Sequence, residues 1–415
     1  MTGGKIAAPQ YLRGLAALMV MLAHWREIGS YPKEHGERLF LTIAMPASQP
    51  NFVNDILSWW NWLVHYLWPL TFSFASGGVL IFFLISGFVI AISVEKYETA
   101  DYAVRRLFRL LPPVWAALAL WCAVHALALT AGIGAPQPYK FETFLVNAFL
   151  VQDWFWKPSI EPGLWTLLVE VKFYALLAML SIAVGRLNVV NIIMLSIILS
   201  IFTLPFFGDY DALSQVSNES GLWWPFYFFR VMNDCIPFII FMLIGTLIYL
   251  SYADRCSISQ LAVAVGTLFA LFATTFLIKP NGVQQLYYVT DGLKVLIVFL
   301  AAMLWQKSKA KFCWLQPATW LLDKLGNISY PLYLVHGMTG MTIGNVIWLK
   351  TENANLATFL GGAITIILAG IIHYVIEKPG QKAGSFLGKK YFRHSANRMM
   401  SAEDTNSASC KSTIS

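Results

Sequence analysis

Residues 11–25 read YLRGLAALMVMLAHW, an apolar helix that carries Arg13 near its start and His24 near its end. The eleven residues from one to the other turn the helix by roughly 1100°, about three full turns, so both side chains lie on one face. Their separation along the axis is about 16 Å. A charge at bilayer depth costs at least about 2.5–3.5 kcal/mol. We therefore expect this face to point into a helix bundle or a polar cavity.

The same two residues allow a plainer interpretation. Arg13 can extend to the lipid headgroups, and a lone His24 can serve only as a hydrogen-bonding group between helices. The rest of the chain decides between the two interpretations.

The composition is that of a membrane protein. Of 415 residues, 57% are hydrophobic and only 12% are charged, and the mean hydropathy is +0.60. A soluble domain averages about 25% charged residues. The net charge of +7 is spread over short segments and a tail, which does not indicate nucleic-acid binding. The five scattered cysteines predict neither a metal site nor a disulfide framework.

Long hydrophobic runs predict an all-α, polytopic integral membrane protein with about ten transmembrane helices. Residues 1–380 are expected to form one transmembrane domain, and residues 381–415 a basic, polar, disordered tail. The first span has no small-residue cleavage site after it, so it is expected to be retained. The predicted spans are residues 9–28, 77–94, 111–131, 163–184, 189–205, 232–251, 258–278, 288–305, 328–348 and 356–376.

Basic residues indicate the orientation of these spans. They are concentrated around Arg105–Arg109, in a predicted loop at 306–326 and in the tail. The positive-inside rule then places both termini in the cytoplasm. Loop 29–70 is rich in Trp and Tyr, which suits a membrane interface and allows a short interfacial helix.

Arg106 and Arg109 form an Arg-x-x-Arg pair just before the third predicted span, with Arg105 beside them. Residues at i and i+3 share a helix face, and two guanidinium groups there suit a phosphate-bearing ligand. The alternative is a stop-transfer charge cluster or a contact with anionic lipid.

Glu170 lies inside the fourth predicted span, between Thr166 and Tyr174 on one polar stripe. A carboxylate in an apolar span is costly, so Glu170 is a candidate functional group that can orient a histidine. The alternative is a pair with Lys172 or Arg230, or a position that water reaches.

Ser329 and His336 lie seven residues apart in ISYPLYLVH, residues 328–336, and are expected to share a helix face. Pro331 fits the first turn of a helix there. Polar packing between helices is the alternative for both residues. His373 and Glu377, one turn apart, are interpreted as an interfacial pair.

These segments resemble the acyltransferase-3 family of bacterial integral-membrane O-acyltransferases, in particular those that modify exopolysaccharide or O-antigen. The resemblance implies transfer of an acyl group, most commonly acetyl, from cytoplasmic acyl-CoA to a hydroxyl of a cell-surface or lipid-linked glycan. It also implies the bacterial inner membrane, with membrane lipids around the protein and no metal. The segments that carry it are residues 11–24, 78–90, 105–115, 164–174 and 328–336.

The resemblance also implies roles for single residues. His24 matches the essential histidine of the family and is expected to be the general base, and Glu170 matches the carboxylate of its W-x-L-x-x-E segment. Lys172 and the long loop 29–70 depart from the family pattern. The loop is expected to lie on the acceptor side, so its departure concerns the identity of the acceptor. The expected acyl-CoA contacts are Arg13, Arg106 and Arg109, and the expected substrate-side residues are Tyr174, Ser329 and His336.

Two other classes of function fit the same features. One is a secondary transporter, since ionisable residues in a bundle also serve transport. The other is a non-catalytic member that binds glycan or assists its assembly. Consumption of a thioester distinguishes the enzyme from both. The sequence indicates neither the acyl group, nor the acceptor hydroxyl, nor the oligomeric state.

Overall fold

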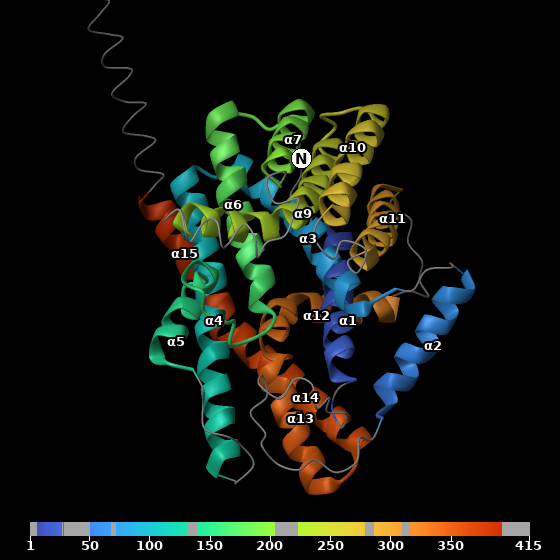
Figure 1. Cartoon of the computed structure of the whole chain (residues 1–415), viewed down its shortest axis with the longest axis vertical. Helices are drawn as coiled ribbons and strands as arrows, with labels where there is room; N and C mark the ends of the chain where they lie inside the picture. The colour runs from blue at the N-terminus through green and yellow to red at the C-terminus, as the bar shows by residue number, and fades with distance from the viewer. Residues whose placement is uncertain are drawn as a thin grey trace, which may run out of the picture.

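The computed structural model describes residues 6–26, 28, 50–67, 72–130, 139–203, 223–278, 286–308 and 316–391. In this part of the chain all regular structure is helical, which confirms the all-α prediction (Figure 1). The helices are α1 (Ala7–Trp25), α2 (Phe52–Leu67), α3 (Phe74–Lys96), α4 (Thr99–Thr130), α5 (Phe141–Ala148), η2 (Gln152–Phe155), α6 (Leu164–Val184), α7 (Val189–Thr203), α9 (Trp223–Tyr252), α10 (Ile258–Leu277), α11 (Leu286–Ser308), α12 (Gln316–Val335), α13 (Met338–Thr351), α14 (Ala354–Ile372), η6 (His373–Glu377) and α15 (Lys378–Tyr391).

Seven helices in the described residues are long and apolar enough to cross a membrane. They correspond to seven of the predicted spans and identify a multi-pass membrane protein. The other three predicted spans fall on α1, on the 15-residue α7, and on the broken pair α12 and α13. A count of ten crossings therefore stays a prediction.

Helices α3 and α9 form the centre of the bundle. In their apolar windows 78% and 83% of the residues are buried, against 33% in α6, α10 and α11, which form its outside. Glycines allow the two central helices to approach closely: a Cβ on Gly87 would lie 1.8 Å from the carbonyl oxygen of Met242. Small residues at a contact are the usual means by which membrane helices pack.

Helix α1 lies against α12 through a second close contact. A Cβ on Gly14 would lie 2.2 Å from the carbonyl oxygen of Leu322, and one on Gly326 would lie 2.4 Å from that of Gln10. The Gln10 amide also donates to Asn327 Oδ1 at 3.0 Å. This contact fixes the rotation of α1 and so decides where Arg13, beside Gly14, points.

Three predicted boundaries are wrong. The predicted third span, residues 111–131, is part of a longer helix that begins at Thr99, so the arginines lie inside α4 rather than at its start. Residues 316–326 of the predicted loop 306–326 are helical. The predicted ninth span is broken after Val335, and Pro331 lies near the end of α12 rather than in a first turn.

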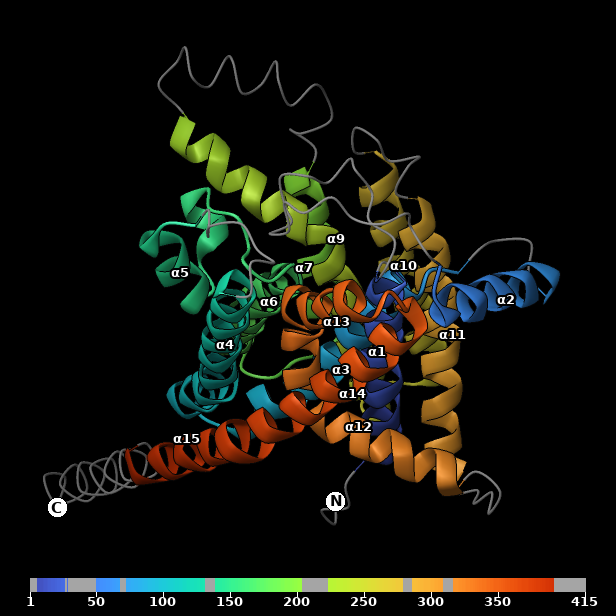
Figure 2. The same cartoon turned by 90° about the horizontal axis from the view of Figure 1, so that it is seen from below.

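In Figure 2, the helices α2 and α15 extend to different sides of the molecule. Helix α2 is the helix expected within loop 29–70, and its place at a membrane interface stays a prediction. Helix α15 continues from α14 through a π-helical turn and packs on α4, so the predicted boundary at residue 380 falls inside a helix. Residues 392–415 of the predicted tail lie outside the described residues.

Candidate active site

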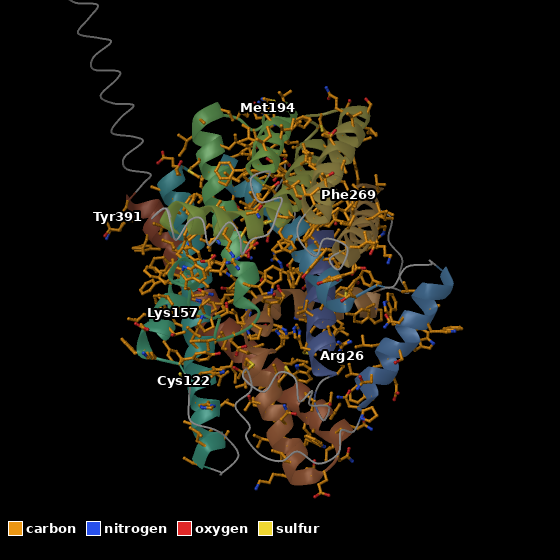
Figure 3. All side chains as sticks on the ribbon, in the orientation of Figure 1. Arg26, Cys122, Lys157, Met194, Phe269 and Tyr391 are labelled. Atoms are coloured by element: carbon orange, nitrogen blue, oxygen red, sulfur yellow. The ribbon has the colours of Figure 1, made fainter. Side chains whose placement is uncertain are left out.

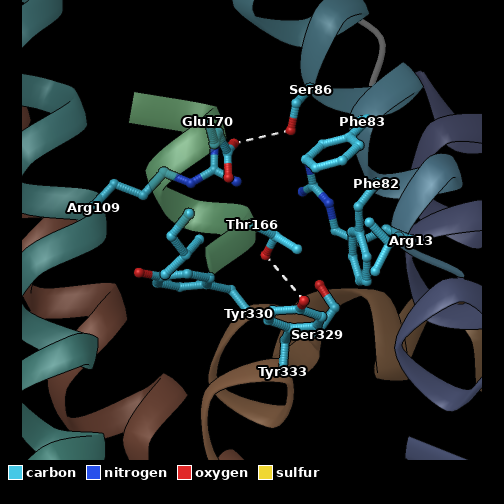
Figure 4. A pocket seen from close by; sticks show the side chains of 12 residues that line it. Arg13, Phe82, Phe83, Ser86, Arg109, Thr166, Glu170, Ser329, Tyr330 and Tyr333 are labelled. Atoms are coloured by element: carbon cyan, nitrogen blue, oxygen red, sulfur yellow. Dashed lines mark hydrogen bonds between the residues drawn. The ribbon is translucent and has the colours of Figure 1, made fainter. Parts of the chain in front are cut away.

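Arg13 and Arg109 reach one small cavity from opposite sides, with Glu170 between them (Figure 4). The cavity holds about 50 Å³ and is enclosed by α1, α3, α4, α6 and α12. Glu170 Oε1 accepts hydrogen bonds from the hydroxyls of Ser86, at 2.9 Å, and Tyr174. Two guanidinium groups and one carboxylate thus give this buried site, named here the arginine cavity, a net positive charge that suits an anionic ligand.

Arg106 lies beside the arginine cavity but does not line it. Its guanidinium group donates to Ser93 Oγ and lies 5.6 Å and 5.4 Å from the ring centroids of Tyr102 and Tyr174. Its Nη1 atom is buried and has no hydrogen-bond partner among the described residues. The two arginines of the Arg-x-x-Arg pair therefore occupy neighbouring positions rather than one cavity.

A larger cavity of about 690 Å³, named here the histidine cavity, is lined by His24 and His336. The two rings lie edge to face with centroids 5.1 Å apart. Tyr333 lines both cavities, and its hydroxyl is hydrogen-bonded to that of Thr166 at 2.9 Å. Arg13 and His24, on one helix, thus face two adjacent cavities with Tyr333 between them.

The hydrogen bonds of the two histidines define their tautomers. Nδ1 of His24 lies 2.8 Å from the carbonyl oxygen of Val20, and Nδ1 of His336 lies 2.8 Å from that of Tyr333. A carbonyl oxygen only accepts, so Nδ1 carries the proton in each ring and the Nε2 lone pair is free in the neutral form. Nε2 of His336 is buried without a hydrogen-bond partner in the described part of the chain.

Glu161 was missed by the sequence analysis. It is 2% exposed, and its carboxylate accepts from the backbone N–H groups of Met338 and Thr339, at 2.9 Å and 3.1 Å, and from the Thr339 hydroxyl at 2.6 Å. It therefore holds the first turn of α13, where a negative charge is favourable. Burial raises the pKa of Glu161 to about 7, against the lowering effect of these hydrogen bonds.

This carboxylate stabilises the helix break that presents His336. The break lies between Val335 and Met338, and the carbonyl oxygen of His336 accepts from Trp25 Nε1 at 2.9 Å. Only the isolated charge in the segment Ile160–Glu161–Pro162 could have drawn attention to Glu161 from sequence.

The structure separates some residues that the sequence placed together. Ser329 lines the arginine cavity, whereas His336, the residue that follows the end of α12, lines the histidine cavity. Tyr174 lines neither cavity and contacts Glu170. Lys172 pairs with Asp153, so it is not the partner of Glu170. The roles of these residues stay predictions.

The pair predicted near the end of the last span can also be located. His373 and Glu377 pair at 2.7 Å within the π-helical turn η6, as the spacing predicts. In the described residues no group of three or more His, Cys, Asp or Glu side chains is arranged to hold a metal ion.

Comparisons with known proteins identify the family of this chain. The pattern of the acyltransferase-3 family, described as an acyltransferase domain, matches residues 6–374. The chain therefore belongs to the acyltransferase-3 family. It is similar to nodulation protein 10 of Rhizobium leguminosarum bv. viciae, with 30% identity over 143 residues. The match covers 29% of this chain and 38% of that relative. No solved structure matches the chain.

Proposed function

We propose that this membrane protein is an acyltransferase that transfers an acyl group, most commonly acetyl, from cytoplasmic acyl-CoA to a hydroxyl of a cell-surface or lipid-linked glycan. The observation that carries the proposal is the position of His24: its Nδ1 is held by the Val20 carbonyl at 2.8 Å, and its ring lines the larger of two adjacent cavities. A neutral imidazole whose Nε2 carries no proton is suited to remove a proton from a hydroxyl near neutral pH.

The proposed reaction is direct transfer. The acceptor O–H gives its proton to Nε2 of His24 while its oxygen attacks the carbonyl carbon of the thioester. The C–S bond then breaks, and the sulfur takes the proton from His24. The products are an ester of the acceptor and free CoA, and His24 returns to its neutral form. His336 lines the same cavity and is proposed to contact the acceptor or the thioester.

The arginine cavity, of about 50 Å³, is proposed to bind a phosphate group of acyl-CoA. Arg13 and Arg109 reach it from different helices, and Arg106 lies next to it with an Nη1 group that has no hydrogen-bond partner among the described residues. Guanidinium groups bind phosphate with paired hydrogen bonds. Glu170 lies between the arginines and accepts hydrogen bonds from Ser86 and Tyr174. We therefore propose that Glu170 orients the arginine side chains rather than His24. In this proposal both termini are cytoplasmic and the histidine cavity faces the acceptor side of a bacterial inner membrane.

Release of free CoA tests the proposed donor. Purified protein in lipid vesicles, given acetyl-CoA and membranes that contain the acceptor, is expected to release CoA thiol in proportion to the ester formed. A transporter or a non-catalytic assembly partner would leave the thioester intact. Release of CoA without ester would retain the donor and exclude the glycan acceptors present in the membranes.

A further inference from the structure

A separate cavity of about 320 Å³ lies between η2, α6 and α9. Trp165, at the start of α6, lines both this cavity and the histidine cavity, so the two are neighbours. In Figure 3, Lys157, which also lines the cavity, marks the flank of the molecule that carries α5. The proposed reaction uses none of the residues that line it, and its volume lies within the usual range of ligand sites.

A stacked aromatic pair forms one wall of this cavity. The rings of Trp156 and Tyr227 are stacked, with centroids 4.1 Å apart and planes at 16°. Trp156 is 63% exposed although it is one of the largest apolar side chains. Its backbone is left-handed, with φ 53°, a conformation that bulky residues rarely adopt. Such strain persists where the surrounding structure holds it, and it is concentrated at binding sites.

Polar groups are fixed around this pair. Asp153 forms an ion pair with Lys172, and its backbone carbonyl accepts from the Tyr227 hydroxyl. The second carboxylate oxygen of Asp153, Oδ1, is buried and has no hydrogen-bond partner among the residues described. Arg230, 5.8 Å from the Trp156 ring centroid, and Asp234 also line the cavity.

We propose that this cavity binds a sugar residue of the acceptor chain next to the sugar whose hydroxyl reaches His24. The inference rests on the proposed function and adds a subsite to it. A sugar ring offers apolar C–H faces to an aromatic ring and hydroxyl groups to carboxylate and guanidinium side chains, which is the combination found here. Asp153 and Asp234, which both line the cavity, supply the carboxylates for such hydroxyls. Acidic side chains beside the basic ones favour a neutral sugar over a phosphate.

The test measures how acyl transfer depends on acceptor length. The probes are a single-sugar fragment and longer fragments released from the surface polysaccharide of the producing cells. The variant is Trp156→Gly, because glycine adopts the left-handed conformation at that position without strain. Trp156→Phe keeps an aromatic face, and Trp320→Ala, at a site 64% exposed on α12, controls for loss of an exposed indole.

For the wild type we expect a lower KM with longer fragments. Trp156→Gly should raise the KM for longer fragments about tenfold, to the single-sugar value, while kcat and the single-sugar KM stay unchanged. The Phe variant and the Trp320 control should keep the length dependence. Length dependence that persists in Trp156→Gly, or is absent from the wild type, would overturn the subsite. Loss of single-sugar transfer in Trp156→Gly would also contradict it. Absence of transfer by the wild type would instead refute the proposed function itself.

Discussion

The imidazole of His24 lies edge to face with that of His336, with ring centroids 5.1 Å apart and planes at 64°. The first ring comes from a continuous helix and the second from the break between α12 and α13. The helix break therefore decides the surroundings of the proposed base. This arrangement leads to predictions for both rings and for the carboxylate that holds the break.

Replacing His336 by Ala is expected to lower kcat by about 10²-fold or more while the KM for acetyl-CoA changes little, because His336 lines the histidine cavity and not the arginine cavity. Steady-state kinetics in lipid vesicles measures both constants. The matched control is His125→Ala, another buried histidine, which stacks on Trp121 and lines neither cavity. An equal loss of kcat in both variants would attribute the effect to packing.

Replacing Arg109 by Ala is expected to weaken acetyl-CoA binding by about ten- to a hundredfold, since a charge-assisted hydrogen bond to phosphate is lost from the arginine cavity. Isothermal titration calorimetry measures the affinity for acetyl-CoA, and the His24→Ala background prevents turnover during the titration. Arg105→Ala is the control, because Arg105 is paired with Asp101 and Ser385 and lines neither the arginine nor the histidine cavity. Unchanged affinity in Arg109→Ala would move the donor site elsewhere.

Replacing Glu161 by Ala is expected to destabilise the protein by about 2 kcal/mol, because three buried donors at the start of α13 lose their acceptor. The expected consequence is a lower Tm together with a lower kcat, since the break that presents His336 loosens. Thermal unfolding in detergent measures the first effect. Glu142→Ala, which removes an exposed partner of Lys157, should leave both Tm and kcat unchanged. A Tm for Glu161→Ala equal to that of the wild type would contradict the role of Glu161 in holding the first turn of α13.

Replacing Gly87 by Ala should prevent the close approach of α3 and α9, because the added Cβ would meet the Met242 carbonyl oxygen at 1.8 Å. The expected loss is about 1–3 kcal/mol or more. Gly266→Ala on α10 is the control, since a Cβ there meets nothing within 4 Å and alanine favours the helix. The measurement is the yield of folded, monodisperse protein after extraction, compared between the Gly87→Ala and Gly266→Ala variants. Equal yields would show that the two central helices can separate without loss.

Much of the fold could be predicted from sequence, because a membrane span needs a long apolar run and little else. The seven long apolar helices follow from that rule. The break after Val335 could not be predicted in this way. It depends on Glu161, which lies far away in the sequence and accepts from the first turn of α13. Hydropathy also cannot show where α4 begins, since Thr99 and the arginines form its polar first turns.

The candidate site was predicted in part. The helical period placed Arg13 and His24 on one face, and each lines one of two adjacent cavities. The seven-residue spacing predicted a shared helix face for Ser329 and His336, and α12 continues as far as Val335, with the His336 N–H still donating to the Leu332 carbonyl oxygen at 3.0 Å. Each of the two residues lines one of the adjacent cavities. The surroundings of Glu170 depend on Ser86 and Arg109, which lie on other helices, and sequence spacing within one helix cannot show such contacts.

The most direct measurement is mass spectrometry of surface polysaccharide from cells that produce the wild type or His24→Ala at equal membrane levels. The account predicts a base-labile ester on the polysaccharide of the wild type, with the mass of one acyl group. It also predicts complete loss of that ester in His24→Ala, because no other group in the histidine cavity is proposed to take the proton. Equal ester content in the two strains would contradict the assignment of His24 as the base.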